Sequence, residues 1–393
     1  MKQLFLPVLL IVLSISETCF AQTGQVLINS KAAGTVHPNP YNLYGAQFPR
    51  IEADGRVTFH FNAPDAKKVQ VAIANVAFDM TKNEDGIWTY TSEPQDKGYH
   101  NYWMIVDGAI VVDPATNAFI GYSHMCNGFE IPDPDGGFYD LKNVPHGNVL
   151  IKNYFSKTIN AWRHIYVYTP PGYEANTSTR YPVFYLQHGG GEDERVWFEM
   201  GRTNLILDNL IAEGKAKPMI IVMETSAAYK PGEAPPQPRA AGQRPATPPD
   251  STQRRRFFSF DTYKEVMLND MIPFIDANFR TLKNANSRAM AGLSMGTFVT
   301  RVVALASPDK FAYLGIFSGG SIAPSDVPDK SKVKLIFMSF GSRERGSAGL
   351  NDAAEVLKQA GINAVSYISP LTAHEWQSWR RSLYEMAPLL FKN

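Results

Sequence analysis

Residues 286–300 read Asn-Ser-Arg-Ala-Met-Ala-Gly-Leu-Ser-Met-Gly-Thr-Phe-Val-Thr and contain the pattern Gly-x-Ser-x-Gly, centred on Ser294. A serine nucleophile must stand clear of the backbone on a sharp turn between a strand and a helix. Glycine two positions before and after the serine leaves room for that close approach. The apolar run at 288–291 predicts the strand, and the small residues at 297–307 predict the helix. Ser294 is therefore the candidate nucleophile.

Five residues can match such a pattern by chance, so the nucleophile hypothesis depends on its partners. An activated serine needs a base, an acid that orients the base, and donors for the oxyanion. In α/β-hydrolases the chain order is serine, acid, histidine. His374 is the only histidine after Ser294 and follows the last predicted strand, at 364–368. His374 is therefore the candidate base.

The acid should lie in the loop after the strand predicted at 333–338. Glu344 is the carboxylate nearest to the end of that strand, and it is our choice. Asp352 is the alternative, although the first turn of the next predicted helix also favours a carboxylate there. Glu344 could instead form a surface ion pair with Arg343 or Arg345.

The oxyanion requires two backbone N–H donors. The residue after the nucleophile, Met295, supplies the first. The second is expected from a loop that follows an early strand, and the sequence Gln-His-Gly-Gly-Gly at 187–191 matches such a loop. Gly190 is our choice within it. His188 precedes the serine in the chain, so we interpret it as structural.

From residue 160 onward, apolar runs of strand length alternate with helical patterns. This alternation predicts an α/β fold with a mostly parallel sheet that helices cover on both faces, over about 145–393. Residues 229–256 interrupt it with seven prolines and little apolar content. They predict a long flexible loop, either a solvated insertion or a flap near the active site.

The N-terminal third has a different pattern. Between residues 51 and 120, short alternating segments separated by Gly and Asp turns predict a small β-sandwich, which we place at 22–125. Trp88, Tyr90, Tyr102 and Trp103 could form a sugar platform, but aromatic residues are more often found in cores, and we favour the core.

Residues 1–21 have the features of a secretory signal peptide, a lysine followed by a short apolar run and small residues before a cleavage site. We expect a secreted or periplasmic bacterial protein with no membrane contact after cleavage. Cys126 is then the single cysteine left, which excludes an intramolecular disulfide and a cysteine-rich zinc site. The formal net charge of +1 shows no excess of basic residues of the kind that binds nucleic acid.

Each of the two predicted parts resembles a known family. The N-terminal part resembles the early-set immunoglobulin-like modules that precede the catalytic domains of many carbohydrate-active enzymes. The resemblance rests on Gly55–Phe59, Ala63–Ala66, Met80–Lys82, Asp85–Trp88 and Val106–Gly108. The remainder resembles the esterase D/feruloyl esterase group of carbohydrate esterases. That resemblance rests on His188–Glu192, Gly201–Asn204, Leu207–Lys215, Gly292–Gly296 and His374–Arg380.

The second resemblance implies a serine esterase that removes feruloyl or acetyl groups from xylan without a metal or organic cofactor. Two positions depart from the family pattern. Thr297 stands where a glycine is common, and Glu344 stands where an aspartate is common. A hydrolase of siderophores or other small esters is an alternative that shares the fold, and a carbohydrate-binding protein that has lost catalysis is another.

Overall fold

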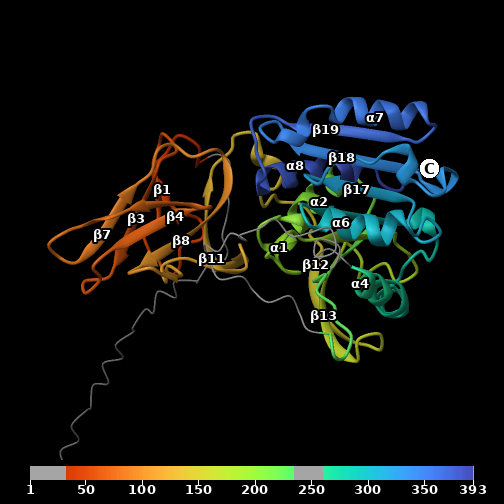
Figure 1. Ribbon diagram of the computed structural model, residues 1–393, viewed down its shortest axis with the longest axis horizontal. Coiled ribbons are helices and arrows are strands. Elements are labelled where there is room, and N and C mark those ends of the chain that lie inside the picture. The colour runs from red at the N-terminus through yellow and green to blue at the C-terminus, as the bar shows by residue number, and fades with distance from the viewer. Residues whose placement is uncertain (1–31, 234–259, 393) are drawn as a thin grey trace, which may run out of the picture.

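The computed structural model describes residues 32–233 and 260–392. The predicted signal peptide and most of the predicted loop at 229–256 lie outside these residues. The described chain has two parts that lie beside one another, an all-β part and an α/β part (Figure 1). In Figure 1 the all-β part is orange to yellow and the α/β part runs from yellow-green to blue.

The all-β part contains two sheets whose paired strands are all antiparallel. The first has the order β1-β2-β3-β7-β6, and the second has the order β10-β11-β8-β4-β5, with β9 paired to β8. The strands are β1 His37–Pro38, β2 Arg50–Ile51, β3 Val57–Asn62, β4 Val69–Ile73, β5 Val76–Asp79, β6 Thr81–Lys82, β7 Ile87–Thr91, β8 Gly98–Val106, β9 Ala109–Val111, β10 Ala118–Gly121 and β11 His124–Ile131.

Apolar side chains from both sheets form the core of this part. Tyr102 is 0% exposed, Trp103 is 6% exposed and Trp88 is 7% exposed, so three of the four aromatic residues that could have been a sugar platform are core residues, as expected. The predicted end of the module at residue 125 is wrong, because it falls inside β11, which pairs with β8 through Ile131. The Gly and Pro content of the residues after 120 is typical of a segment that joins two domains, so the sequence does not predict this strand.

The α/β part is built on one sheet of the order β12-β13-β15-β14-β16-β17-β18-β19. The strands β12, β13 and β15 pair antiparallel, and every pair from β15 to β19 is parallel. The bounds are β12 Asn148–Ser156, β13 Ala161–Thr169, β14 Val183–Gln187, β15 Ile220–Met223, β16 Arg288–Leu293, β17 Tyr313–Phe317, β18 Leu335–Gly341 and β19 Ala364–Ser369. β14 to β18 are buried throughout, as continuous apolar runs predict.

Helices cover both faces of this sheet. The α-helices are α1 Val196–Glu199, α2 Thr203–Ala212, α4 Asp261–Val266, α5 Ile272–Asn278, α6 Gly296–Thr300, α7 Leu350–Gln359 and α8 Trp376–Met386. Two π-helical segments continue α4 and α6, η3 Met267–Met271 and η5 Arg301–Leu305. The short 3-10 segments are η2 Gly136–Phe138, η4 Ala285–Ser287, η6 Pro324–Asp326, η7 Lys330–Lys332, η8 Arg345–Ser347 and η9 Ala387–Leu389.

The two faces have separate cores. Apolar residues of α4, α5, α6 and α7 pack in one cluster, and those of α1, α2 and α8 pack in the other. The second cluster also takes in Tyr41, Tyr99 and Phe119 from the all-β part. The two parts of the chain therefore share a core, and they are not independent bodies joined by a linker.

A buried ion pair crosses the same boundary. Arg380 on α8 donates to both carboxylate oxygens of Glu130 on β11, at 2.7 and 3.2 Å, and both side chains are fully buried. Tyr41 and Tyr139 donate their hydroxyls to the same carboxylate, and Arg380 Nε donates to the Met200 carbonyl. Buried charges need such partners because removal from water is costly.

Among residues 32–233 and 260–392, no helix has the length and apolar character that crossing a bilayer requires.

Candidate active site

The Gly-x-Ser-x-Gly segment forms the turn between β16 and α6. Ser294 has φ of +50°, a left-handed conformation that is unfavourable for a residue with a side chain. A Cβ on Gly292 would lie 2.2 Å from the Gly296 carbonyl oxygen, and one on Gly296 would lie 2.6 Å from the His188 carbonyl oxygen. Both glycines are therefore required by the close approach of backbone segments, as the sequence predicts.

The unusual Thr297 has a packing explanation. Its hydroxyl is buried and donates to the Ser294 carbonyl at 2.6 Å. A Cβ on Gly319 would lie 1.9 Å from Thr297 Oγ1. The Thr297 side chain therefore fits because residue 319 is a glycine. The departure from the family pattern thus leaves the turn intact.

Ser294, His374 and Glu344 form a continuous chain of hydrogen bonds. Ser294 Oγ lies 2.9 Å from His374 Nε2, and His374 Nδ1 lies 2.7 Å from Glu344 Oε2. With Nδ1 donating to the carboxylate, Nε2 is left as the acceptor for the serine hydroxyl. Asp352 is exposed in the first turn of α7, and no hydrogen bond joins it to His374 within the described residues.

Glu344 is held as a carboxylate. Ser318 Oγ and the Gly341 N–H each donate to its Oε1 at 2.7 Å, and Trp379 Nε1 donates to Ser318 Oγ at 3.0 Å. Burial by itself raises the pKa of the Glu344 carboxyl, but the hydrogen bonds from His374, Ser318 and Gly341 outweigh it and leave the pKa below its ordinary value. A carboxylate with this pKa stays ionised at neutral pH.

Two backbone donors lie beside the serine. The Cβ position of Gly190 is 3.8 Å from Met295 Cβ, so the loop after β14 and the turn after β16 meet here. Within the part of the chain that the structure describes, the N–H groups of Gly190 and Met295 donate to no protein acceptor. Both donors remain available to a ligand, in the positions that the sequence predicts.

His188 supports the loop that carries Gly190. It is buried, its Nδ1 donates to the Gly189 carbonyl at 2.7 Å, and its Nε2 accepts the Ser226 N–H at 3.1 Å. Burial lowers the pKa of the His188 imidazole, which keeps Nε2 free to accept. The prediction that His188 is structural is confirmed by these contacts.

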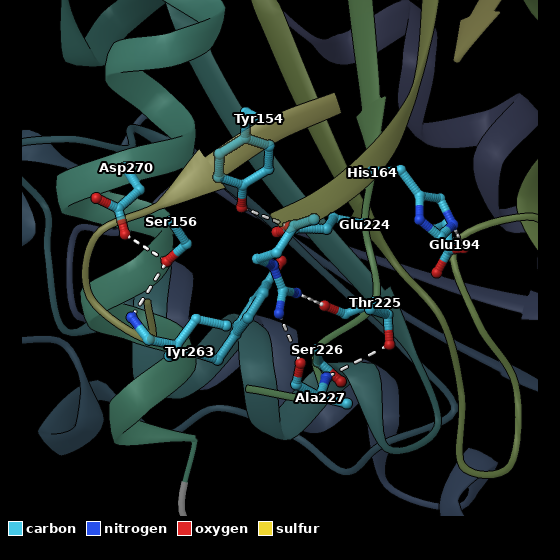
Figure 2. A network of polar contacts seen from close by, with 12 residues as sticks. Tyr154, Ser156, His164, Glu194, Glu224, Thr225, Ser226, Ala227, Tyr263 and Asp270 are labelled. Atoms are coloured by element: carbon cyan, nitrogen blue, oxygen red, sulfur yellow. Dashed lines mark hydrogen bonds and ion pairs between the residues drawn. The ribbon is translucent and has the colours of Figure 1, made fainter. Parts of the chain in front are cut away.

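The loop after β15 is anchored in turn by a buried network (Figure 2). Tyr154 Oη and Arg163 Nε both donate to Glu224 Oε1 at 2.5 Å, and Tyr154 and Glu224 point toward one another in Figure 2. Arg163 also donates to the carbonyls of Thr225 and Ala227. Tyr154 on β12 and Arg163 on β13 thus hold residues 224–227 in place, and this keeps Ser226 in contact with His188.

A cavity of about 340 Å³ opens above the serine. The α/β part contributes the catalytic candidates and the rings of Trp376 and Trp379. The all-β part contributes further lining residues. The lining residues are Ala74, Tyr99, His100, Asn101, Tyr122, Gly189, Gly190, Glu192, Leu293, Ser294, Ala373, His374, Glu375, Trp376 and Trp379.

Sequence reasoning missed the residues that the all-β part brings to this cavity, among them Asn101 and Tyr122. No local signal marks them, because they approach Ser294 only through the packing of two parts of the chain. Glu192 also lines the cavity, and its Oε2 accepts the Gly189 N–H at 2.8 Å. Burial raises the pKa of the Glu192 carboxyl to about 8, so it is mostly protonated at neutral pH.

No group of three or more His, Cys, Asp or Glu side chains is placed to hold a metal ion within residues 32–233 and 260–392. Cys126 is a buried free thiol, and Asn101 Nδ2 donates to its sulfur.

Comparison with known proteins identifies the family of the α/β part. The family model Esterase, described as "Putative esterase", matches residues 156–390. The chain belongs to this esterase family. The match begins at the last residue of β12 and extends beyond α8, so it includes the candidate triad, and it confirms the predicted class of enzyme, an ester hydrolase.

One relative with an assigned activity matches almost the whole chain. It is an endo-1,4-beta-xylanase/feruloyl esterase of Xylanibacter ruminicola, 37% identical over 374 residues, which are 93% of this chain and 48% of that protein. An endo-1,4-beta-xylanase Y of Acetivibrio thermocellus is 24% identical over 66% of this chain and 24% of its own length. The chain therefore spans half or less of the length of these two relatives.

Solved structures share the fold. A ferulic acid esterase from Anaeromyces mucronatus bound to ferulic acid superposes with a TM-score of 0.53 at 22% identity, covering 64% of this chain and 93% of that one. The enterobactin esterase of Shigella flexneri superposes with a TM-score of 0.61 at 16% identity, covering 86% of this chain and 92% of that one. These likenesses support an α/β-hydrolase fold.

Proposed function

We propose that this chain is a secreted serine carboxylesterase that releases feruloyl groups from plant-wall xylan. The observation that carries the proposal is the hydrogen-bonded chain from Ser294 through His374 to Glu344, with two unpaired N–H groups beside it in the described part of the chain. The N-terminal sandwich is assigned to the early-set immunoglobulin-like type. No metal or organic cofactor takes part in the mechanism.

In this mechanism Ser294 Oγ attacks the ester carbonyl while His374 Nε2 takes its proton. The N–H groups of Met295 and Gly190 stabilise the oxyanion that forms. The bond from the carbonyl carbon to the sugar oxygen then breaks while His374 donates its proton to that oxygen, so the sugar leaves as an alcohol and the acyl group stays on Ser294. Water, deprotonated by His374, hydrolyses that acyl-enzyme. Glu344 holds the imidazole tautomer and stabilises the imidazolium in both steps.

The cavity favours an aromatic acyl group over acetyl. Several of its lining residues carry aromatic rings, and a volume of about 340 Å³ far exceeds what a methyl group fills. Aromatic rings pack well against aromatic walls in offset or edge-to-face geometry. The Xylanibacter relative, whose name includes feruloyl esterase, supports the same choice.

A turnover panel tests the proposed function. We expect the full chain to cleave methyl ferulate with kcat/KM about 10-fold or more above that for acetylated xylan, because only the aromatic acyl group fills the cavity. Ferulate release from feruloylated arabinoxylan should accompany it. Acetate release without ferulate release would contradict the proposal.

A siderophore esterase is the second candidate. The Shigella enterobactin esterase aligns with 86% of this chain, whereas the Anaeromyces esterase aligns with 64%. The alignment with the Shigella enzyme therefore includes more of the N-terminal region. A cyclic triscatechol ester belongs in the same panel. Faster hydrolysis of that ester than of methyl ferulate would favour this second function.

Replacing Glu344 with glutamine tests its role in the triad. The amide cannot hold the required imidazole tautomer, and the matching change in a serine protease lowers kcat by roughly 10⁴-fold. We expect a loss of about that size in Glu344→Gln, measured as steady-state kcat on methyl ferulate. The control is Asp352→Asn, which alters an exposed carboxylate on α7 and should leave kcat unchanged. A larger loss in the control would transfer the role to Asp352.

A further inference from the structure

The turn between β10 and β11 has an unfavourable backbone. Tyr122 and Ser123 form its two central residues, with φ of +54° and +68°. Two-residue hairpin turns with positive φ at both positions are usually Asn-Gly, because a Cβ is crowded there. Strained residues of this kind persist where the surrounding structure holds them, and they are concentrated at functional sites.

This turn lies directly against the loop that carries the oxyanion donor. The Ser123 N–H donates to the Gly191 carbonyl at 3.0 Å. Gly191 itself has φ of +75°, and a Cβ there would lie 2.6 Å from the Ser123 nitrogen. The two turns are therefore in backbone contact, one residue away from Gly190.

Tyr122 lines the same cavity as Ser294. It packs on Trp103, with ring centroids 5.2 Å apart, and Trp103 contacts His124 edge to face. The ring is thus fixed from behind by the sandwich, while 41% of the residue stays exposed. A half-exposed aromatic ring in the same cavity as the candidate nucleophile is suited to pack against a planar aromatic group.

We propose that Tyr122 is a specificity-determining residue that contacts the aromatic acyl group of the ester, so that the N-terminal sandwich supplies part of the active site. The inference rests on the proposed function and deepens it. A feruloyl group extends from Ser294 into the cavity and packs on the ring, whereas an acetyl group stays beside the serine. The Ser123 bond to Gly191 holds the ring in register with the oxyanion loop.

The experiment compares acyl groups in matched variants of the full chain. Tyr122→Asn removes the ring but keeps a residue that tolerates positive φ. We expect it to lower kcat/KM for methyl ferulate by about 10-fold and to change kcat/KM for p-nitrophenyl acetate by less than about threefold. Tyr122→Phe should restore most of the ferulate activity, because it keeps the ring.

Trp162→Ala is the control for loss of an aromatic side chain. Trp162 is 73% exposed on the β12–β13 hairpin and does not line the cavity. It should leave both rates unchanged. Ethyl and arabinosyl ferulate separate the two ends of the ester, since contact with the acyl group predicts the same loss in Tyr122→Asn for every alcohol.

Three results would overturn the inference. An equal loss on both esters would make the turn a support for the loop alone, and no loss would place the ring away from the substrate. A loss that varies with the alcohol would assign Tyr122 to the sugar side. Turnover of ferulate by the wild type tests the proposed function separately. If the wild type does not hydrolyse ferulate esters, the proposed function and the inference are both wrong. If it does, and Tyr122→Asn leaves the ratio of kcat/KM for methyl ferulate to that for p-nitrophenyl acetate unchanged, only the inference is wrong.

Discussion

Ser294→Ala should abolish ester hydrolysis while the protein stays folded. Removal of the nucleophile costs roughly 10⁶-fold in kcat in a serine hydrolase, because the remaining triad members cannot act without it. The loss should be complete for methyl ferulate and for p-nitrophenyl acetate alike, since both share the acyl-enzyme mechanism. Steady-state assays and thermal unfolding of the same preparation check the two halves of this result.

The matched control is Ser331→Ala. Ser331 is exposed in η7, before β18, and so lies toward the amino ends of the parallel strands, whereas Ser294 follows the carboxyl end of β16. Its variant should keep wild-type rates. If Ser294→Ala retained the wild-type rate, the mechanism through Ser294 would be wrong. If the variant and the wild type both showed only the uncatalysed rate, a carbohydrate-binding protein without catalysis would become the better explanation.

Arg380→Ala should destabilise the folded chain by about 3–5 kcal/mol. The change leaves the Glu130 carboxylate fully buried without its cation, and it also leaves the Met200 carbonyl without the Nε donor. A buried charge that loses its partner still carries its desolvation penalty but no longer has the electrostatic attraction that offset that penalty. The thermal midpoint and the urea midpoint should both fall sharply.

The surface offers a closely matched control for this pair. Arg343 pairs with Asp96, and this pair also joins the α/β part to the sandwich, but both side chains are about half exposed. Arg343→Ala should therefore cost less than about 1 kcal/mol. Adding Glu130→Gln to Arg380→Ala should recover part of the loss by removing the stranded charge. Equal effects of the two arginine variants would refute the role assigned to burial.

Much of the fold was predictable because its signals are local. The apolar runs at 181–187, 218–223 and 311–317 each contain a buried strand of the main sheet, since strands covered on both faces must be apolar throughout. The strand β11 was not predicted, because its pairing with β8 is a contact between distant residues and its turn lacks the usual Asn-Gly signal.

The sequence by itself was enough to propose Ser294 as the nucleophile and to predict the turn around it. The glycines around Ser294 and the single downstream histidine, His374, follow from chemistry that demands those residue types in that order. Tertiary structure alone decided that Glu344 and not Asp352 lies within hydrogen-bond distance of the His374 imidazole, and that Ser123 and Arg380 take part in contacts between the sandwich and the active-site domain. Those contacts link segments far apart in the chain, so only packing, and no local pattern, brings them together.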